Sequence, residues 1–288
     1  MMIAEIPVGV LGGSGVYDLD RLRDAREIAL DTPFGVPSDR IVVGEWEGVR
    51  TAFLPRHGRG HRLTPSEVPY RANLWALRSL GVHRLLSVSA VGSLCEEYTP
   101  GDFVLVDQFV DRTFRRETSF FGGGAAVHVP MAEPVCAEMA RVVQQEAAGL
   151  PLKVYRGGTY VCIEGPQFST RAESHLHRAW GCKIVGMTNV TEAKLAREAG
   201  MSFCCVAMVT DYDCWHPQHG DVDVAKVMEV VGRNARNVRD LVRRAIAPLA
   251  ALGPSPWRGI ARAGLITAPA AIPAETRRRV GLLLELPE

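Results

Sequence analysis

Short apolar runs bounded by polar or glycine-rich turns recur along the chain up to Leu249. A run of roughly four to eight apolar residues is typical of a strand buried on both faces, although a buried helix segment can look alike. The run from Phe203 to Val209 contains two adjacent cysteines and β-branched residues, which favour a strand, and it ends abruptly in Thr-Asp-Tyr-Asp. If the chain stays extended there, Asp211 and Asp213 point to the same side. This pair indicates a ligand site, and the alternative is a helix cap or an Asx turn.

The same pattern predicts most of the other elements. Strands are predicted at 8–11, 84–91, 103–110, 160–163 and 183–187, together with a hairpin that joins 40–45 to 49–54. Helices are predicted at 69–80, within 131–148, and at 171–180, 191–199 and 224–249. Strands that alternate with helices around buried sheets are typical of an α/β fold in a single domain.

The composition changes at Gly253, where proline, alanine and arginine become frequent. We therefore predict a domain over residues 1–252 and a Pro/Ala/Arg-rich C-terminal tail over residues 253–288. The stretch from Thr267 to Ala274 resembles a linker.

Composition and charge narrow the classes of protein. The chain has 288 residues, 47% of them hydrophobic, and a formal net charge of +1, which suits a globular protein with a sizeable core. It has no basic stripe typical of a nucleic-acid-binding protein and no apolar stretch near the ~20 residues of a membrane span. The seven cysteines form no C-x-x-C pair, so we expect reduced thiols in a cytoplasmic protein, rather than a zinc site or disulfides.

Groups that suit an anion follow several of the predicted strands. Ser14 lies in a glycine-rich turn that lacks the dinucleotide fingerprint, because position 18 is Asp, and no Walker lysine follows. Arg56 and His57 come directly after the hairpin and suit a phosphate, although a solvated basic loop is the alternative. With Ser89-Ala90 and Thr188, these groups are predicted to meet Asp211 at one edge of the sheet.

Ten sequence blocks, in this order, resemble the methylthioadenosine phosphorylase branch of the trimeric purine nucleoside phosphorylase family over about residues 8–249. The blocks are GGSG at 12–15, TPFGVPSD at 32–39, PRHGRGH at 55–61, GSL at 92–94, PGD at 100–102, DQFVDRT at 107–113, HVPMAEP at 128–134, EGPQFSTRAE at 164–173, MTNVTEAKLAREAG at 187–200 and TDYDCW at 210–215. The resemblance implies a nucleoside phosphorylase-like fold, in which helices flank a central mixed, twisted and partly barrel-like sheet.

By resemblance, the activity is cleavage of a nucleoside's N-glycosidic bond by inorganic phosphate, with no metal and no organic cofactor. The family then implies these phosphate-binding residues: Ser14, Arg56, His57, Ser89, Ala90 and Thr188. Hydroxyls, a guanidinium and turn amides are directed donors to an anion.

The resemblance also assigns the nucleoside site. Met187 lies along the ribose, Phe168 stacks on the purine, and Ser169 is a polar neighbour of the base. On the helix over 224–249, the side chains of Val224, Val227 and Met228 share one face; core packing is their ordinary interpretation, and the family adds an apolar pocket for a small 5′ substituent. In a homotrimer, His128 reaches this pocket from the neighbouring subunit.

Asp211 decides the substrate class, with Asp213 as its partner. A protonated carboxyl can donate to purine N7, and a carboxylate can accept from a 6-amino group. The branch that prefers 6-oxopurines has Asn at this position, so Asp predicts a 6-aminopurine such as 5′-methylthioadenosine. The alternatives are an inosine or guanosine phosphorylase, a hydrolytic nucleosidase and a non-catalytic binding module. If burial and Asp213 raise its pKa, Asp211 is the general acid.

Overall fold

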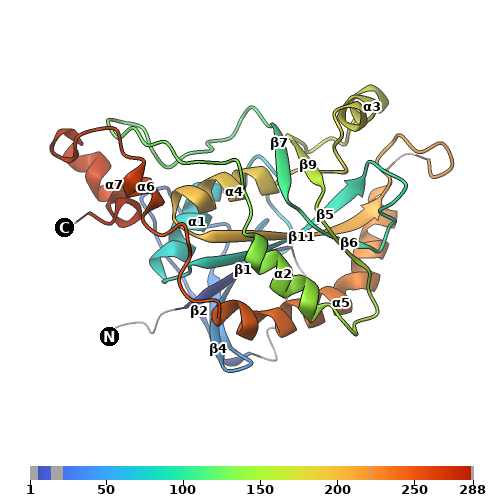
Figure 1. The fold of residues 1–288 in the computed structure, drawn as a ribbon, viewed down its shortest axis with the longest axis horizontal. Coiled ribbons are helices and arrows are strands. Elements are labelled where there is room, and N and C mark those ends of the chain that lie inside the picture. Colours follow the sequence, from blue (N-terminus) through green and yellow to red (C-terminus); the bar gives the residue numbers. More distant parts are fainter. Residues whose placement is uncertain (1–5, 14–21, 221, 287–288) are drawn as a thin grey trace.

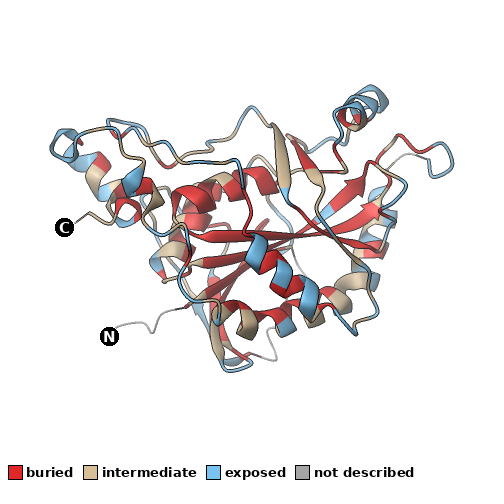
Figure 2. Cartoon of the chain, viewed as in Figure 1, coloured by how far each residue is buried: buried red, intermediate tan, exposed pale blue. Residues whose placement is uncertain are grey.

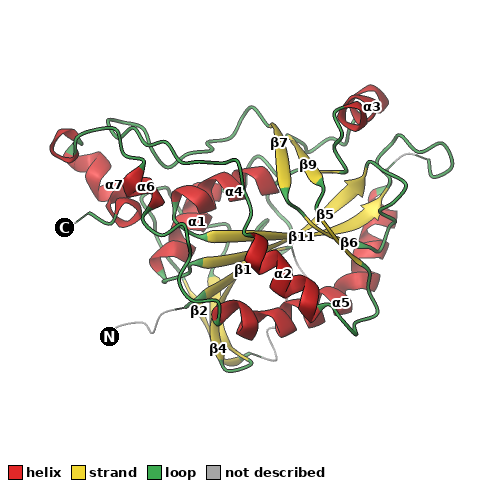
Figure 3. Ribbon diagram, viewed as in Figure 1, coloured by secondary structure: helices red, strands yellow, loops and turns green. Residues whose placement is uncertain are grey.

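The computed structural model describes residues 6–13, 22–220 and 222–286. Its strands belong to one 11-stranded mixed sheet, whose main path runs β2-β3-β4-β1-β5-β10-β9-β7 (Figure 1, Figure 3). A second branch leaves β5 through β11 and continues to β6 and β8. The bounds are β1 Val8–Gly12, β2 Arg23–Ile28, β3 Ile41–Trp46, β4 Val49–Pro55, β5 Arg84–Ser93, β6 Phe103–Leu105, β7 Gln108–Arg112, β8 Val154–Arg156, β9 Thr159–Ile163, β10 Ile184–Gly186 and β11 Ser202–Asp211.

The centre of the sheet is β5, which pairs in parallel with β1 and β11 and antiparallel with β10. Every residue of β11 from Ser202 to Thr210 is buried, as expected for a strand covered on both faces. The prediction of a mixed α/β sheet flanked by helices is confirmed, and over the described residues the sheet does not close on itself.

Helices cover the sheet in two layers (Figure 1). On one side, α2 and α5 pack against a cluster that includes Met139, Val206 and Leu241. On the other side, α1 and α4 pack with Leu74, Leu195 and Cys205. Figure 2 shows the buried residues concentrated where the strands run between these layers. The bounds are α1 Tyr70–Ser79, α2 Ala137–Glu146, α3 Arg171–Ala179, α4 Asn189–Glu198 and α5 Val224–Ala250.

Several predicted bounds need correction. The single strand predicted over 103–110 is two strands, because β6 pairs with β11 and β8, whereas β7 pairs with β9. The helix predicted within 131–148 begins only at Ala137, because Cys136 is its extended N-cap. The edge strand β2 has the polar sequence RDAREI and is mostly exposed, so the hydrophobic pattern gave no signal for it.

The C-terminal segment is folded against the rest of the chain. It contains α6 Ile260–Ala263, the 3-10 helix η2 Pro269–Ala271 and α7 Ala274–Leu284. Leu283 joins the main core, and Val280 packs in a cluster with Ala125. The linker interpretation of 267–274 was therefore wrong, while the domain division at residue 252 stays a prediction. Over the part of the chain that the structure describes, no helix has the length and apolarity to cross a membrane.

Candidate functional site

The C-terminal ends of β1, β4, β10 and β11 meet around the second half of β5. The register places Gly12 opposite Pro55, Leu11 opposite Ser87, and both Val185 and Asp211 opposite Gly92. Because β10 runs antiparallel to β5, the residues that follow Val185 run back along β5 toward Ser89. The residues predicted for phosphate and for the base therefore lie at one edge of the sheet, with Ser14 outside the described residues.

Arg56 is 2% exposed and is held by a buried network. Its Nη1 donates to the Val88 carbonyl at 2.9 Å and its Nη2 to Ser87 Oγ at 2.7 Å. Nε and Nη2 both donate to the carboxylate of Glu192, which is fully buried. Burial alone would lower the pKa of Arg56, but the charge of Glu192 raises it. Among the described residues, one N–H of Nη1 has no protein partner and can face a ligand.

His57 is held as a neutral ring. Burial, and then the charge of Arg56, lower its pKa to about 4. Its Nδ1 lies 2.8 Å from the carbonyl oxygen of Leu63, and because a carbonyl only accepts, Nδ1 carries the proton. The Nε2 atom is then an acceptor. His57 can therefore accept a hydrogen bond from a protonated phosphate oxygen but adds no positive charge.

Ala90 and Thr188 have local features that suit a ligand. Ala90 is the one exposed residue of β5, which is otherwise buried, so its backbone borders open space. Thr188 is the N-cap residue of α4, yet its hydroxyl makes no capping hydrogen bond to the helix amides. Its Oγ1 accepts instead from the side chain of Asn189 at 3.3 Å. First-turn amides without partners favour an anion.

Asp211 ends β11 with both carboxylate oxygens engaged. Oδ1 accepts from the Asp213 amide at 2.8 Å, and Oδ2 accepts from the Thr210 hydroxyl at 2.7 Å. Burial raises the pKa of Asp211, and the nearby Asp213 charge raises it further, while these two hydrogen bonds lower it. The carboxyl keeps its proton to higher pH than an ordinary Asp, as a general acid requires.

Asp213 does not continue an extended strand. Its φ of 50° lies in the left-handed region, and its amide closes an Asx turn on Asp211. The backbone here therefore follows the Asx turn that was the alternative prediction to an extended strand. Asp213 is nevertheless 4% exposed, and its Oδ2 has no hydrogen-bond partner among the described residues. Burial raises its pKa, and the nearby Ser174 and Ser169 hydroxyls partly offset this.

The residues predicted for the base and the ribose lie beside these carboxyls. Cys214 donates from Sγ to the Ser169 carbonyl at 3.3 Å, which ties the segment after β9 to the end of β11. Phe168 is 44% exposed, so its ring is free to stack. Met187 follows β10, whose neighbour β9 leads into the same segment.

The face of α5 predicted for the 5′ pocket is exposed in the single chain. Val224 is 61% exposed and Met228 58%, whereas Val227 is half-buried. Core packing is therefore excluded for Val224 and Met228 within one chain. Figure 1 shows the N-terminal end of α5, where these residues lie, near the arrowheads of β5 and β11.

His128 lies apart from the other predicted residues. It is exposed, and its amide donates to the Gly264 carbonyl at 3.0 Å beside α6. Figure 1 shows α6 at the opposite end of the molecule from the arrowhead of β11. The His128 side chain therefore does not complete the site of its own chain.

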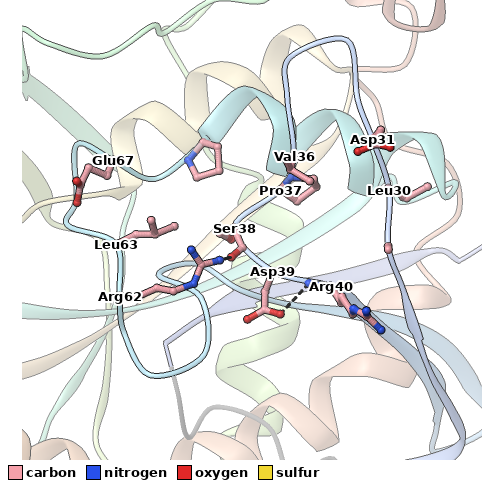
Figure 4. Close-up of a pocket in the computed structure, with 12 residues that line it drawn as sticks. Leu30, Asp31, Val36, Pro37, Ser38, Asp39, Arg40, Arg62, Leu63 and Glu67 are labelled. Atoms are coloured by element: carbon pink, nitrogen blue, oxygen red, sulfur yellow. Dashed lines mark hydrogen bonds between the residues drawn. The ribbon is translucent and has the colours of Figure 1, made fainter.

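An open pocket of about 560 Å³ lies beside this site (Figure 4). It borders the His57 loop through Leu63, and Arg62 crosses it to donate to the Ser38 carbonyl at 2.7 Å. None of the residues predicted for the site lines it. Among the described residues, no group of three His, Cys, Asp or Glu side chains could hold a metal ion.

Sequence reasoning missed three charged residues that organise the site. Glu192 holds Arg56, but a glutamate within a predicted helix is ordinarily a solvated residue. Arg116 and Glu164 form a second buried pair, with their side chains 1% and 7% exposed. Glu164 directly follows a predicted strand, as the other candidates do, and that position was the available signal.

Comparisons with known proteins show the family to which the chain belongs. A family model described as the phosphorylase superfamily matches residues 7–247. The S-methyl-5′-thioadenosine phosphorylase of Rhodospirillum rubrum is 57% identical over 84% of this chain and 82% of its own. A methylthioadenosine phosphorylase structure from an antarctic soil metagenomic library has a TM-score of 0.92 and 46% identity, covering 97% of this chain and 99% of its own. A Schistosoma mansoni methylthioadenosine phosphorylase in complex with adenine has a TM-score of 0.86 and 38% identity, covering 92% of this chain and 100% of its own.

Proposed function

This chain belongs to the phosphorylase superfamily, and from that premise we propose that it cleaves 5′-methylthioadenosine with inorganic phosphate to adenine and 5-methylthioribose 1-phosphate. The observation that carries the proposal is the half-buried Asp211, whose pKa is raised above that of an ordinary Asp, at the same sheet edge as the buried Arg56. The printed names of the relatives support the same activity.

The reaction breaks the bond between C1′ and purine N9 and forms a bond between C1′ and a phosphate oxygen. Asp211 donates its proton to N7, so that adenine leaves neutral while it takes the bonding electrons. The sugar gains oxocarbenium character, and the bound phosphate stabilises this charge before it attacks C1′. Arg56, the neutral His57, Ser89, Ala90 and Thr188, with Ser14, hold the phosphate.

The phosphate dependence separates phosphorolysis from hydrolysis. Adenine release from methylthioadenosine is measured with and without phosphate, and the sugar product is identified by mass. We expect release only with phosphate, and a phosphorylated sugar. Equal release without phosphate would mean that the chain is a hydrolytic nucleosidase.

The base preference separates the proposal from a 6-oxopurine phosphorylase. Asp211 and Asp213 can accept from a 6-amino group, so methylthioadenosine should have a much higher kcat/KM than inosine. A higher kcat/KM for inosine would favour the alternative. The same comparison with adenosine and 5′-halogenated analogues defines the 5′ group.

The active form is a homotrimer in the cytoplasm, with each pocket shared between two subunits. Exposed apolar side chains support an interface, since Phe114 is 80% exposed and Val224 61%. His128 of one subunit, with Val224, Val227 and Met228 of the next, surrounds the 5′ group, while Phe168, Ser169, Met187 and Asp213 contact the rest of the nucleoside. The chemistry uses phosphate as co-substrate and no cofactor.

A further inference from the structure

Arg116 is a buried arginine that the reaction described above does not use. It follows β7, its side chain is 1% exposed, and each of its guanidinium nitrogens donates a hydrogen bond. Nη1 donates to the Met187 carbonyl and to Tyr70 Oη at 3.2 Å. Nη2 donates to the Glu164 carbonyl at 2.6 Å, and Nε to the Glu164 carboxylate at 3.4 Å. The guanidinium also lies over the Tyr70 ring, 5.4 Å from its centroid.

Glu164 is held as the ionised partner of Arg116. Its carboxylate accepts from the Ser66 hydroxyl and from the amides of Phe114, at 2.7 Å, and Arg115, at 3.2 Å. Burial alone would raise the pKa of Glu164, but these hydrogen bonds and the charge of Arg116 lower it. Hydrogen bonds from fixed donors make this a rigid anchor for Arg116.

The two carbonyls that Arg116 binds belong to different halves of the nucleoside site. Glu164 begins the segment that carries Phe168, which is assigned to the purine, and Met187 is assigned to the ribose. The strands before them, β9 and β10, are parallel neighbours with Cys162 opposite Gly186. Gly165 also packs on Met187, since a Cβ at Gly165 would lie 2.6 Å from its Sδ. Arg116 thus bridges the two segments where they leave the sheet.

We propose that Arg116 is a positioning residue that fixes the separation between the base-binding and the ribose-binding segments. This inference rests on the proposed function for what the two segments bind. Arg116 acts through two backbone carbonyls and Glu164, and it does not touch the substrate. A planar guanidinium reaches both carbonyls at once, whereas a lysine ammonium on a flexible stem does not reproduce that geometry.

The test compares Arg116→Lys with Arg115→Lys, a matched control at the adjacent, exposed arginine. Both variants keep the charge. KM is measured separately for methylthioadenosine and for phosphate, and the affinity for free adenine is measured by calorimetry. The midpoint of thermal unfolding records any general loss of structure.

For Arg116→Lys we expect the methylthioadenosine KM to rise about tenfold or more, because small misplacements of binding groups are costly. The phosphate KM should rise much less, since Arg116 reaches the phosphate residues only through the peptide unit that joins Met187 to Thr188. Adenine, which spans only one segment, should lose less affinity than the nucleoside. Arg115→Lys should match the wild type. An unchanged nucleoside KM, or an equal rise in both KM values, would overturn the proposal.

Two further measurements separate the possible failures. If Arg116→Lys does not fold, the isosteric variant Glu164→Gln is measured in its place. Its KM for methylthioadenosine must rise more than its KM for phosphate, and an equal change in the two KM values counts against the proposal. If the wild type shows no phosphate-dependent turnover, the proposed function fails. Arg116 is then judged on calorimetric binding of methylthioadenosine relative to adenine, where an equal change for both ligands would refute its role.

Discussion

At the scale of single residues, Asp211 is the half-buried carboxyl that we propose as the general acid. Its pKa is raised mainly by burial, so folded Asp211 keeps its proton to a higher pH than an ordinary Asp. Asp211→Asn keeps the shape but cannot give up a proton. We expect kcat for methylthioadenosine to fall at least ~100-fold, the range typical of a lost general acid. Steady-state kinetics at saturating phosphate measures this, and unchanged kinetics would remove Asp211 from its role.

The pH dependence of stability tests the same pKa shift. An Asp in the unfolded chain titrates near the ordinary value of 3.8, whereas folded Asp211 titrates higher. Its contribution to the free energy of unfolding is therefore greatest below 3.8, declines as pH rises through the folded pKa, and is constant above it. Asn does not titrate, so Asp211→Asn should gain stability relative to the wild type across this window. Urea unfolding at several pH values measures the free energy of unfolding of both proteins. The value for Asp211→Asn relative to the wild type should rise with pH across this window, and a fall would contradict the raised pKa.

Two buried glutamates of α4 provide a matched test of the Arg56 network. Glu192 pairs with Arg56, whereas the partners of Glu198 among the described residues are Ser119 and Phe120, and burial raises the pKa of Glu198. Glu192→Gln leaves a buried cation unpaired and should lower the free energy of unfolding by about 3–5 kcal/mol. Glu198→Gln should cost much less. Added phosphate should stabilise Glu192→Gln more than the wild type, because the anion replaces the lost charge; equal stabilisation would contradict this.

The site residues that could be predicted from the sequence share one property, which is their place directly after a buried strand. Arg56, Thr188 and Asp211 were found in this way. The registers of the strands that precede or contain them place these residues at the same edge of the sheet. Glu192 lies inside a helix and Arg116 in a loop. Their importance depends on long-range contacts, which no local pattern encodes.

At the scale of elements, the sequence predicted the strands that are buried on both faces of the sheet, and it missed strands that are exposed at the edges. The runs that became β5 and β11 are rich in apolar residues and buried along nearly their whole length, so their type was clear. The exposed edge strand β2 and the three-residue β8 gave no such signal, because edge pairing needs few apolar side chains. The Pro/Ala/Arg-rich C-terminal segment was predicted from composition to be a tail with a linker-like stretch, yet a few buried residues such as Val280 fix it to the rest of the chain.

Two glycines test whether the C-terminal segment holds the His128 loop. A Cβ at Gly264 would lie 2.0 Å from the His128 carbonyl oxygen, whereas a Cβ at Gly281, inside α7, would meet nothing within 4 Å. Gly264→Ala should therefore lower the free energy of unfolding by about 1–3 kcal/mol. Gly281→Ala should raise it by about 0.5–1 kcal/mol, since alanine suits a helix better. Denaturant unfolding measures both, and similar effects in the two variants would show that this packing is loose.

At the scale of the whole molecule, the site that we propose needs residues from two chains. Asp211 ends β11, and His128 lies beside α6. Figure 1 shows the arrowhead of β11 and α6 at opposite ends of the molecule. One nucleoside therefore cannot contact both residues of the same chain. The exposed face of α5 also needs an apolar cover, which a second copy of the chain can supply. A closed trimer with repeated heterologous contacts satisfies both requirements.

Subunit mixing tests this shared pocket. Asp211→Asn lacks the proton donor, and His128→Ala should bind the nucleoside weakly, so each variant alone should be nearly inactive at nucleoside concentrations well below the wild-type KM. In oligomers co-expressed in equal amounts, about one quarter of the pockets should join an intact Asp211 to an intact His128 from the next subunit. Activity should then recover to about that fraction of the wild type, whereas the two variants purified separately and mixed without exchange should stay inactive. If each pocket belonged to one chain, co-expression would restore nothing, because every chain carries one of the two defects.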